Sequence, residues 1–270
     1  MRYTNLRFVK GHGTENDFVV LPPYDGDLTA ETVAALCDRH AGIGADGVLR
    51  VVPQDGRFFM DYRNADGSVA EMCGNGIRVF ARFLVSSGLA DPGEIPIDTR
   101  NGVLVVTVPE DGGDITAEMG HPARLDDAKV TVGSASWPGV GWSMGNPHLV
   151  VLDAAPIDEI DLGVEPGVEP VASFPDGVNV EFLEPVGPRH VRMRVFERGV
   201  GETRSCGTGA CAAAVAAMDA AGIRTSYVVD VPGGRLVVEW REDGMVLMTG
   251  PAVLVAKGDV DPELIRSSRG

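Results

Sequence analysis

Lysine is scarce in this chain of 270 residues, which has only Lys10, Lys129 and Lys257 and therefore no polybasic patch for a membrane surface. Acidic residues (39 Asp and Glu) outnumber basic ones (23 Lys and Arg), and a net charge of −16 disfavours nucleic acid as a partner. No apolar run approaches the roughly 18 residues of a membrane span, and residues 1–10 lack the apolar core of a secretory signal. We therefore expect a cytoplasmic protein that binds neither nucleic acid nor membrane.

Cysteine is scarce as well, and four cysteines in 270 residues are too few for a disulfide scaffold: Cys37, Cys73, Cys206 and Cys211. The chain has no C-x₂-C or H-x₃-H spacing, so no metal site is indicated. The hydrophobic share of 44% and the charged share of 23% are typical of globular proteins. At about 150 residues per domain, this length indicates two domains.

Short strands separated by turns fill most of the sequence. Strands are expected at 8–10, 17–21, 48–52, 58–62, 103–108, 115–119, 149–152, 178–183, 191–196, 227–231, 236–240, 246–249 and 252–256. Helices are expected at 29–39, 77–86 and 208–221, with a weaker one over 158–162.

The most informative feature is an internal repeat. Three segments match three later ones in the same order, at offsets of 130, 130 and 133 residues: 16–20 with 146–150, 46–48 with 176–178, and 72–76 with 205–209. Such self-similarity indicates two halves of one plan, joined near residue 120. In each half a Cys-Gly-X-Gly motif opens a helix, so a pseudo-twofold relation would let Cys73 and Cys206 face each other across an interdomain cleft.

Two facing thiols at helix starts suit proton transfer to carbon. Half ionisation of a cysteine at pH 7 needs a pKa shift of about 1.5 units, or about 2 kcal/mol, which a partly buried helix N-terminus can supply. Two close thiolates repel, so one thiol should ionise while the other keeps its proton. Such a pair can deprotonate one face of a carbon and protonate the opposite face, which inverts a stereocentre. The N–H groups of the helix starts would hold the adjoining carboxylate and stabilise the developing charge.

Five segments resemble the diaminopimelate epimerase family: GHGTENDFVV (11–20), NADGSVAEMCGNGIR (64–78), GNPHLVV (145–151), GVNVEF (177–182) and ERGVGETRSCGTGACA (197–212). The resemblance implies a homodimeric, cofactor-independent enzyme that interconverts LL- and meso-2,6-diaminopimelate in lysine and peptidoglycan precursor synthesis. It also implies an α/β (α+β) fold of two pseudo-symmetric domains, each a curled, barrel-like sheet around a central helix, with the active site in the cleft between them. The expected domains are residues 1–120, rejoined by a C-terminal strand at 257–270, and residues 121–256.

The resemblance also assigns roles to individual residues. Cys73 and Cys206 become the two catalytic acid/bases, with His148 and Glu197 tuning the thiol pKa values. The residues expected to bind the small-molecule substrate are Asn16, Asn64, Gly74, Asn75, Asn146, Asn179, Glu197, Arg198, Gly207 and Thr208. An arginine fork suits the carboxylate at the non-reacting end of diaminopimelate.

The chain departs from the family pattern in two places. Gly47 stands where many relatives carry glutamine, and the first motif contains Thr14 and Glu15 in place of its commoner sequence. The remaining cysteines, Cys37 and Cys211, are expected in the core.

Three alternatives remain open at this point. A proline or hydroxyproline racemase would share the two-thiol design but binds a substrate without a second charged end. A pyridoxal-phosphate enzyme needs a Schiff-base lysine, and none of the three lysines lies in a recognisable site. A β-rich binding or redox-sensing protein would use Cys73 and Cys206 as a switchable disulfide.

Overall fold

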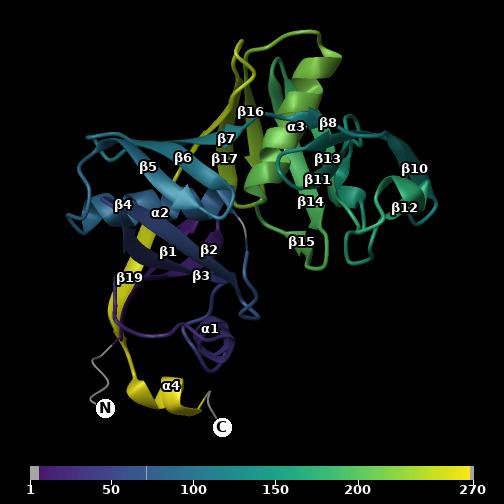
Figure 1. Cartoon of the computed structure of the whole chain (residues 1–270). Helices are drawn as coiled ribbons and strands as arrows, with labels where there is room; N and C mark the ends of the chain where they lie inside the picture. The colour runs from purple at the N-terminus through teal and green to yellow at the C-terminus, as the bar shows by residue number, and fades with distance from the viewer. Residues whose placement is uncertain (1–5, 71, 268–270) are drawn as a thin grey trace. The chain divides into compact units, whose positions relative to one another are not determined.

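The computed structural model describes residues 6–70 and 72–267; Glu71, inside the first cysteine segment, and the last three residues of the expected strand 257–270 lie outside this description. The chain forms two compact units, one of residues 1–117 with 251–270 and the other of residues 118–250. The expected mixed α and β fold is confirmed, with strands predominating (Figure 1). No helix in the described part of the chain is long and apolar enough to span a membrane.

The strands of the first unit pair in one continuous run. Its helices are α1 (Ala30–Cys37), α2 (Gly74–Ser86) and α4 (Pro262–Ser267). Its strands are β1 (Leu6–Gly13), β2 (Asn16–Leu21), β3 (Gly47–Gln54), β4 (Arg57–Asn64), β5 (Gly93–Thr99), β6 (Gly102–Val108), β7 (Ile115–Gly120, which reaches into the second unit) and β19 (Val253–Val260). They pair in the order β19-β1-β2-β3-β4-β5-β6-β7, parallel at β2–β3 and β4–β5 and antiparallel elsewhere.

The second unit contains α3 (Gly207–Ala220) and 3₁₀ turns at Ile157–Glu159 and Val171–Ser173. Its strands are β8 (Ala123–Arg124), β9 (Ala128–Val132), β10 (Ala135–Ser143), β11 (Pro147–Val151), β12 (Gly167–Glu169), β13 (Asn179–Gly187), β14 (His190–Glu197), β15 (Gly201–Thr203), β16 (Ser226–Val231), β17 (Gly234–Trp240) and β18 (Val246–Gly250). The principal order is β10-β11-β13-β14-β16-β17-β18, with β8 and β9 beside β10, β12 beside β9 and β15 beside β14.

The strand pairing repeats between the two units. The run β1-β2-β3-β4-β5-β6 alternates antiparallel, parallel, antiparallel, parallel, antiparallel, and β10-β11-β13-β14-β16-β17 alternates in the same way. In each run the long helix, α2 or α3, connects the fourth strand to the next parallel one. The repeat found in the sequence is therefore a repeat of topology.

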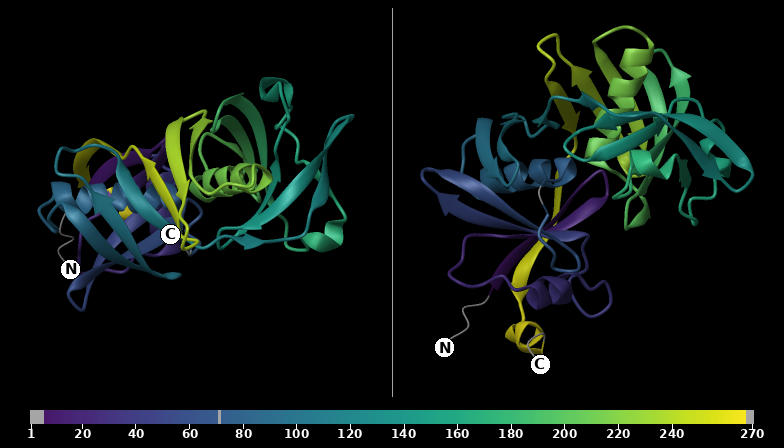
Figure 2. Two further views of the ribbon diagram at one scale, coloured as in Figure 1. Left: turned by 90° about the horizontal axis from the view of Figure 1, so that it is seen from above. Right: turned by 45° about the vertical axis from the view of Figure 1, so that its right-hand side comes forward.

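Each long helix forms the centre of its own unit. Helix α2 packs against β1, β2, β3, β6 and β19, and α3 packs against β10, β11, β13, β14, β16, β17 and β18. The left view of Figure 2 looks along α3 with the strands of its unit curving around it. Because strands surround α3, ten of the eleven residues from Gly207 to Ala217 are buried, and its Ala-rich sequence leaves room for this close packing.

Several expected elements differ at their boundaries. Helix α2 begins at Gly74 rather than residue 77, because the cysteine motif itself forms the first turn. The weak helix at 158–162 is only a 3₁₀ turn. The elements not expected from the sequence are strands β5, β8, β9, β10, β12 and β15 and helix α4. The C-terminal strand is β19, which starts at Val253, pairs with β1 and ends before α4, so it is not a strand over 257–270.

Candidate active site

Cys73 caps the N-terminus of α2 in the first unit. Its backbone is extended, and its Sγ accepts a hydrogen bond from the Gly76 N–H at 3.4 Å. Among the described residues, the first turn of α2 has no acidic side chain. Cys73 is half-buried, and Gly74 and Asn75 follow it as the first two residues of the helix, where N–H groups have no acceptor within the helix.

Two asparagines adjoin this cysteine. The Cys73 thiol donates to Asn16 Oδ1 at 3.5 Å, and Asn75 Nδ2 donates to the same oxygen at 3.3 Å. The Asn75 side chain is fully buried, and its Oδ1 accepts from Arg78 Nη2 at 3.0 Å and from Thr14 Oγ1 at 3.4 Å. Cys73, Asn16 and Asn75 are thus joined by hydrogen bonds, with the Asn75 side chain directed into the fold.

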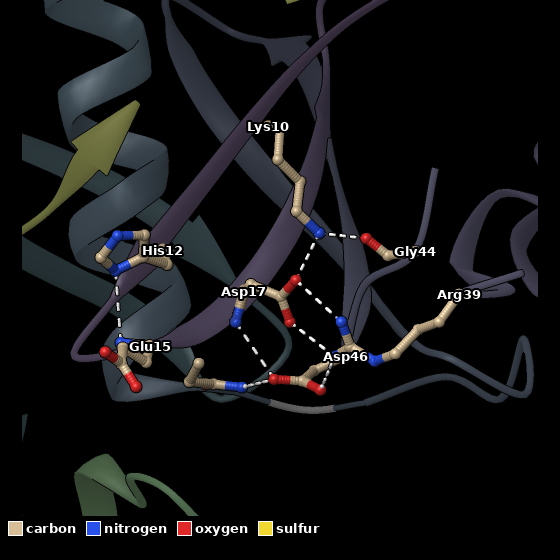
Figure 3. Close-up of polar contacts among 8 residues, drawn as sticks. Lys10, His12, Glu15, Asp17, Arg39, Gly44 and Asp46 are labelled. Atoms are coloured by element: carbon tan, nitrogen blue, oxygen red, sulfur yellow. Dashed lines mark hydrogen bonds and ion pairs between the residues drawn. The ribbon is translucent and has the colours of Figure 1, made fainter. Parts of the chain in front are cut away.

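The charged side chains of Lys10, Asp17, Arg39 and Asp46 form an ionic cluster (Figure 3), and this cluster fixes the orientation of Asn16. Asn16 Nδ2 donates to Asp46 Oδ2 at 2.7 Å, which leaves the amide oxygen to face Cys73. Asp46 also accepts from Arg39 at 2.7 Å and from the Asp17 N–H at 3.1 Å, while Lys10 and Arg39 both pair with the Asp17 carboxylate. Burial alone would raise the pKa of the Asp17 carboxyl, but hydrogen bonds from Arg39 and Lys10 outweigh it and lower this pKa to about 2.

The two departures from the family pattern have a structural explanation. Thr14 and Glu15 form the two-residue turn between β1 and β2, with φ of 48° and 64°, and the Thr14 hydroxyl holds Asn75. A Cβ at Gly47 would lie 2.5 Å from the Arg63 carbonyl oxygen and 2.8 Å from the Tyr62 ring. The backbone at position 47 therefore has no room for glutamine in its present conformation.

Asn64 ends β4 opposite Gly47, and its Nδ2 donates to Ser68 Oγ at 3.0 Å. The turn after it is closed by a hydrogen bond from the Gly67 N–H to the Asn64 carbonyl. Asn64 thus lies on the strand beside β3, and its side chain holds the turn that follows β4.

Cys206 caps α3 in the second unit with the same geometry as Cys73. Its Sγ accepts from the Gly209 N–H at 3.4 Å and contacts Thr208 Oγ1 at 3.5 Å, and Gly207 and Thr208 form the start of the helix. Unlike Cys73, Cys206 is buried. Burial raises the pKa of the Cys206 thiol well above its ordinary value, and the carboxylates of Glu197 and Glu181 raise it further.

A buried hydrogen-bonded chain lies near Cys206. His148 Nδ1 is 2.7 Å from Glu181 Oε1, and His148 Nε2 is 3.0 Å from Asn146 Oδ1. His148 and Glu181 are both fully buried. Two predicted residues, His148 and Asn146, are therefore linked to each other and to Glu181, which the sequence analysis did not single out.

The remaining predicted residues of the second unit lie on two neighbouring strands: Glu197 ends β14, with Arg198 directly after it, and Asn179 begins β13. Glu197 accepts from the Thr203 hydroxyl, and burial raises the pKa of the Glu197 carboxyl. The Asn179 side chain bridges two backbone groups: its Nδ2 donates to the Pro147 carbonyl at 3.0 Å and its Oδ1 accepts from the Arg198 N–H at 2.9 Å. Arg198 is exposed, and its Nη1 donates to the Asp176 carbonyl at 3.0 Å.

Both cysteine sites can therefore hold an anion beside a thiol, because each places a sulfur and helix N–H groups at one point. The two other cysteines, Cys37 and Cys211, are buried, and burial raises the pKa of Cys37 to about 12. Such thiols are inert core residues, as expected.

The residues that the sequence analysis missed support these sites rather than form them. Asp46 orients Asn16, Arg78 and Thr14 hold Asn75, and Glu181 binds His148. Glu181 could have been noticed from the sequence, because a charged residue interrupts an apolar run there. That run is the part of β13 buried on both faces, and a buried charge indicates a functional role.

Comparisons with known proteins agree with the sequence motifs. The family described as diaminopimelate epimerase matches residues 8–125 and 141–255. The chain is 51% identical over 279 residues to the diaminopimelate epimerase of Streptomyces coelicolor, covering 96% of each protein. It is 49% identical over 278 residues to that of Thermobifida fusca, covering 97% of this chain and all of the relative.

Solved structures share the fold at low sequence identity. A predicted epimerase from Pseudomonas aeruginosa is similar with a TM-score of 0.74 and 16% identity, covering 94% of this chain and 99% of that one. A hydroxyproline epimerase from Agrobacterium vitis has a TM-score of 0.68 and 17% identity, covering 97% and 95%. These likenesses establish the architecture.

Proposed function

The chain belongs to the diaminopimelate epimerase family, and from this premise we propose that its two helix-capping cysteines interconvert LL- and meso-2,6-diaminopimelate by two-base proton transfer. As a member of this family the protein is an epimerase, a type of isomerase. We propose that its product serves lysine and peptidoglycan precursor synthesis. The observation that carries the proposed mechanism is the repeated cap: Cys73 and Cys206 each accept the N–H of the third helical residue at 3.4 Å.

The proton balance follows from the thiols. One cysteine, as thiolate, removes the α-proton and becomes a thiol, while the other thiol donates its proton to the opposite face of the same carbon and becomes a thiolate. The net reaction inverts one stereocentre and exchanges the roles of the two cysteines, so no cofactor is needed. The helix N–H groups at Gly74–Asn75 and Gly207–Thr208 stabilise the charge that develops on the reacting carboxylate.

The environment of Cys206 indicates which thiol holds the proton before substrate binds. Burial and two nearby carboxylates raise its pKa, so Cys206 rests as the thiol and donates to carbon first. A two-base reaction then needs Cys73 as the thiolate, so Cys73 has to lose the proton that it donates to Asn16 Oδ1 in this structure. In the reverse direction the roles exchange, since each turnover leaves the proton on the other sulfur.

The other predicted residues bind the substrate or hold residues that do. Asn16, Asn64 and Asn146 offer amide groups to its polar atoms, and Arg198 takes the carboxylate of the non-reacting end while Glu197 takes its ammonium. Asn179 fixes the backbone of Arg198, and His148 binds Glu181, which lies near Cys206. We further propose a cytoplasmic homodimer, which light scattering on the purified protein tests.

Proton NMR of LL-diaminopimelate in D₂O, with reduced protein and no added cofactor, tests the function. The expected result is loss of the α-proton signal at one centre as the meso isomer forms. Exchange of L-proline or hydroxyproline instead would assign the chain to the racemase alternative. Absence of turnover with all three substrates, in reduced and oxidised protein alike, would overturn the enzyme assignment.

A further inference from the structure

The two repeated units differ beneath their cysteine-capped helices. In the first unit, a Cβ on Gly76 would lie 3.4 Å from both Phe18 and Leu49. Phe18 pairs with Gly47 in the parallel β2–β3 ladder, and Leu49 follows two residues later. In the second unit, the corresponding β11–β13 ladder pairs His148 with Asn179, and Glu181 follows two residues later.

An apolar pair in one unit is therefore an ionisable pair in the other. Phe18 and Leu49 are fully buried, as are His148 and Glu181. Burying a carboxylate costs several kcal/mol unless partners compensate for lost water. The Oε1 of Glu181 has His148 as its partner at 2.7 Å, whereas its buried Oε2 has no hydrogen-bond partner among the described residues. Such a costly arrangement marks a functional position.

Glu181 also lies close to the catalytic sulfur. The position that a Cβ on Gly209 would occupy is 2.7 Å from Glu181 Oε1 and 3.3 Å from Cys206 Sγ. Only a glycine permits this close approach between the carboxylate and the helix start. The titratable groups around Cys206 are then His148 on β11, Glu181 on β13 and Glu197 on β14.

We propose that Glu181 is a positioning residue of the second cysteine site: its carboxylate orients His148, and through it Asn146, and its charge opposes ionisation of the Cys206 thiol. This role rests on the two-thiol function proposed above. It explains why Cys206 ionises less readily than Cys73. In the first unit the equivalent place is occupied by Leu49, whose side chain is apolar.

The test measures alkylation of Cys206 by iodoacetamide as a function of pH in the full-length Cys73→Ala protein, with the modified residue identified by peptide mass spectrometry. Glu181→Gln removes the charge and keeps the shape, so the pH midpoint should fall by about one unit and alkylation below the midpoint should accelerate about tenfold. The double variant His148→Phe with Glu181→Leu copies the apolar pair of the first unit and should move the midpoint in the same direction. Exposed Glu239→Gln, an equal charge change in the same unit, should leave it unchanged.

An unchanged or higher midpoint in folded Glu181→Gln protein would overturn the proposal, and the double variant supplies the same readout if that protein does not fold. A shift in Glu239→Gln of equal size would also overturn it, since any distant charge would then suffice. Alkylation requires no turnover. Failure of the epimerase assignment would therefore appear as absent exchange in the NMR assay, separately from the response of Cys206.

Discussion

The ionic cluster beneath Asn16 makes a quantitative prediction about stability and pH. Asp17 lies between Lys10 and Arg39, its side chain is 18% exposed, and these partners lower its pKa from 3.8 to about 2 despite burial. A carboxyl whose folded-state pKa is depressed stabilises the fold above the unfolded pKa and loses this contribution as the pH falls through the folded pKa. The full contribution is about 2.5 kcal/mol above pH 5 and about half of that at pH 3.

Asp17→Asn isolates this contribution from all other titrations. We expect it to lower the free energy of unfolding of the first unit by about 2–3 kcal/mol at pH 6, with the difference from the parent halving by pH 3. Amide hydrogen exchange read on peptides from β2 measures this locally, and peptides from β13 give the matching value for the second unit. Tryptophan fluorescence is a further control, because Trp137, Trp142 and Trp240 all belong to the second unit.

Exposed Asp25→Asn supplies the matched charge change within the first unit. It should shift the stability by less than about 0.5 kcal/mol at any pH in this range. A constant Asp17→Asn difference between pH 6 and pH 3 would refute the reasoning, because a loss of packing alone does not depend on the protonation of Asp17.

Three further predictions concern the sites themselves. Replacing Cys73 or Cys206 with Ala should lower kcat in the NMR exchange assay by at least about 100-fold, while Ser at either position should leave a weak enzyme. Wild-type turnover in either Ala variant would exclude the two-base mechanism. Gly209→Ala should destabilise more than Gly76→Ala in urea unfolding, because its Cβ would meet Glu181 at 2.7 Å whereas the nearest contact of a Cβ at position 76 is 3.3 Å. Gly47→Gln should lower the free energy of unfolding by about 1–3 kcal/mol, and an unchanged urea midpoint would show that the backbone there relaxes.

Much of the architecture follows from local sequence signals. The helix at residue 30 has a Thr cap whose side chain accepts the Thr32 N–H, and α3 is Ala-rich and followed closely by Gly222. The repeat could be recognised in the sequence because its motifs contain glycine and cysteine at positions where the backbone conformation or the chemistry tolerates few other residues. Strands such as β5 and β10 were missed because proline interrupts both, so their polarity patterns are not regular.

The support of the sites could not be predicted in the same way. Asp46 contacts Asn16 although 30 residues separate them in the sequence. Arg78 donates to Asn75 within α2, where the helical spacing of apolar residues indicates a buried face but not which polar side chains are buried with it. Hydrogen bonds of this kind depend on strand register and side-chain direction, which a single sequence does not specify. Motif matching finds the cysteines and leaves the residues that orient their neighbours unidentified.

The repeat does not make the two cysteine sites equivalent. Equivalent positions invite equivalent roles, yet Phe18 and His148 occupy the same place in the ladder with opposite chemistry, as do Leu49 and Glu181. An enzyme that moves a proton between two thiols needs one of them to keep its proton, and two identical environments would not select which. Divergence within the repeat, at the residues beneath the helix starts, therefore supplies the asymmetry that the cysteine motifs alone do not contain.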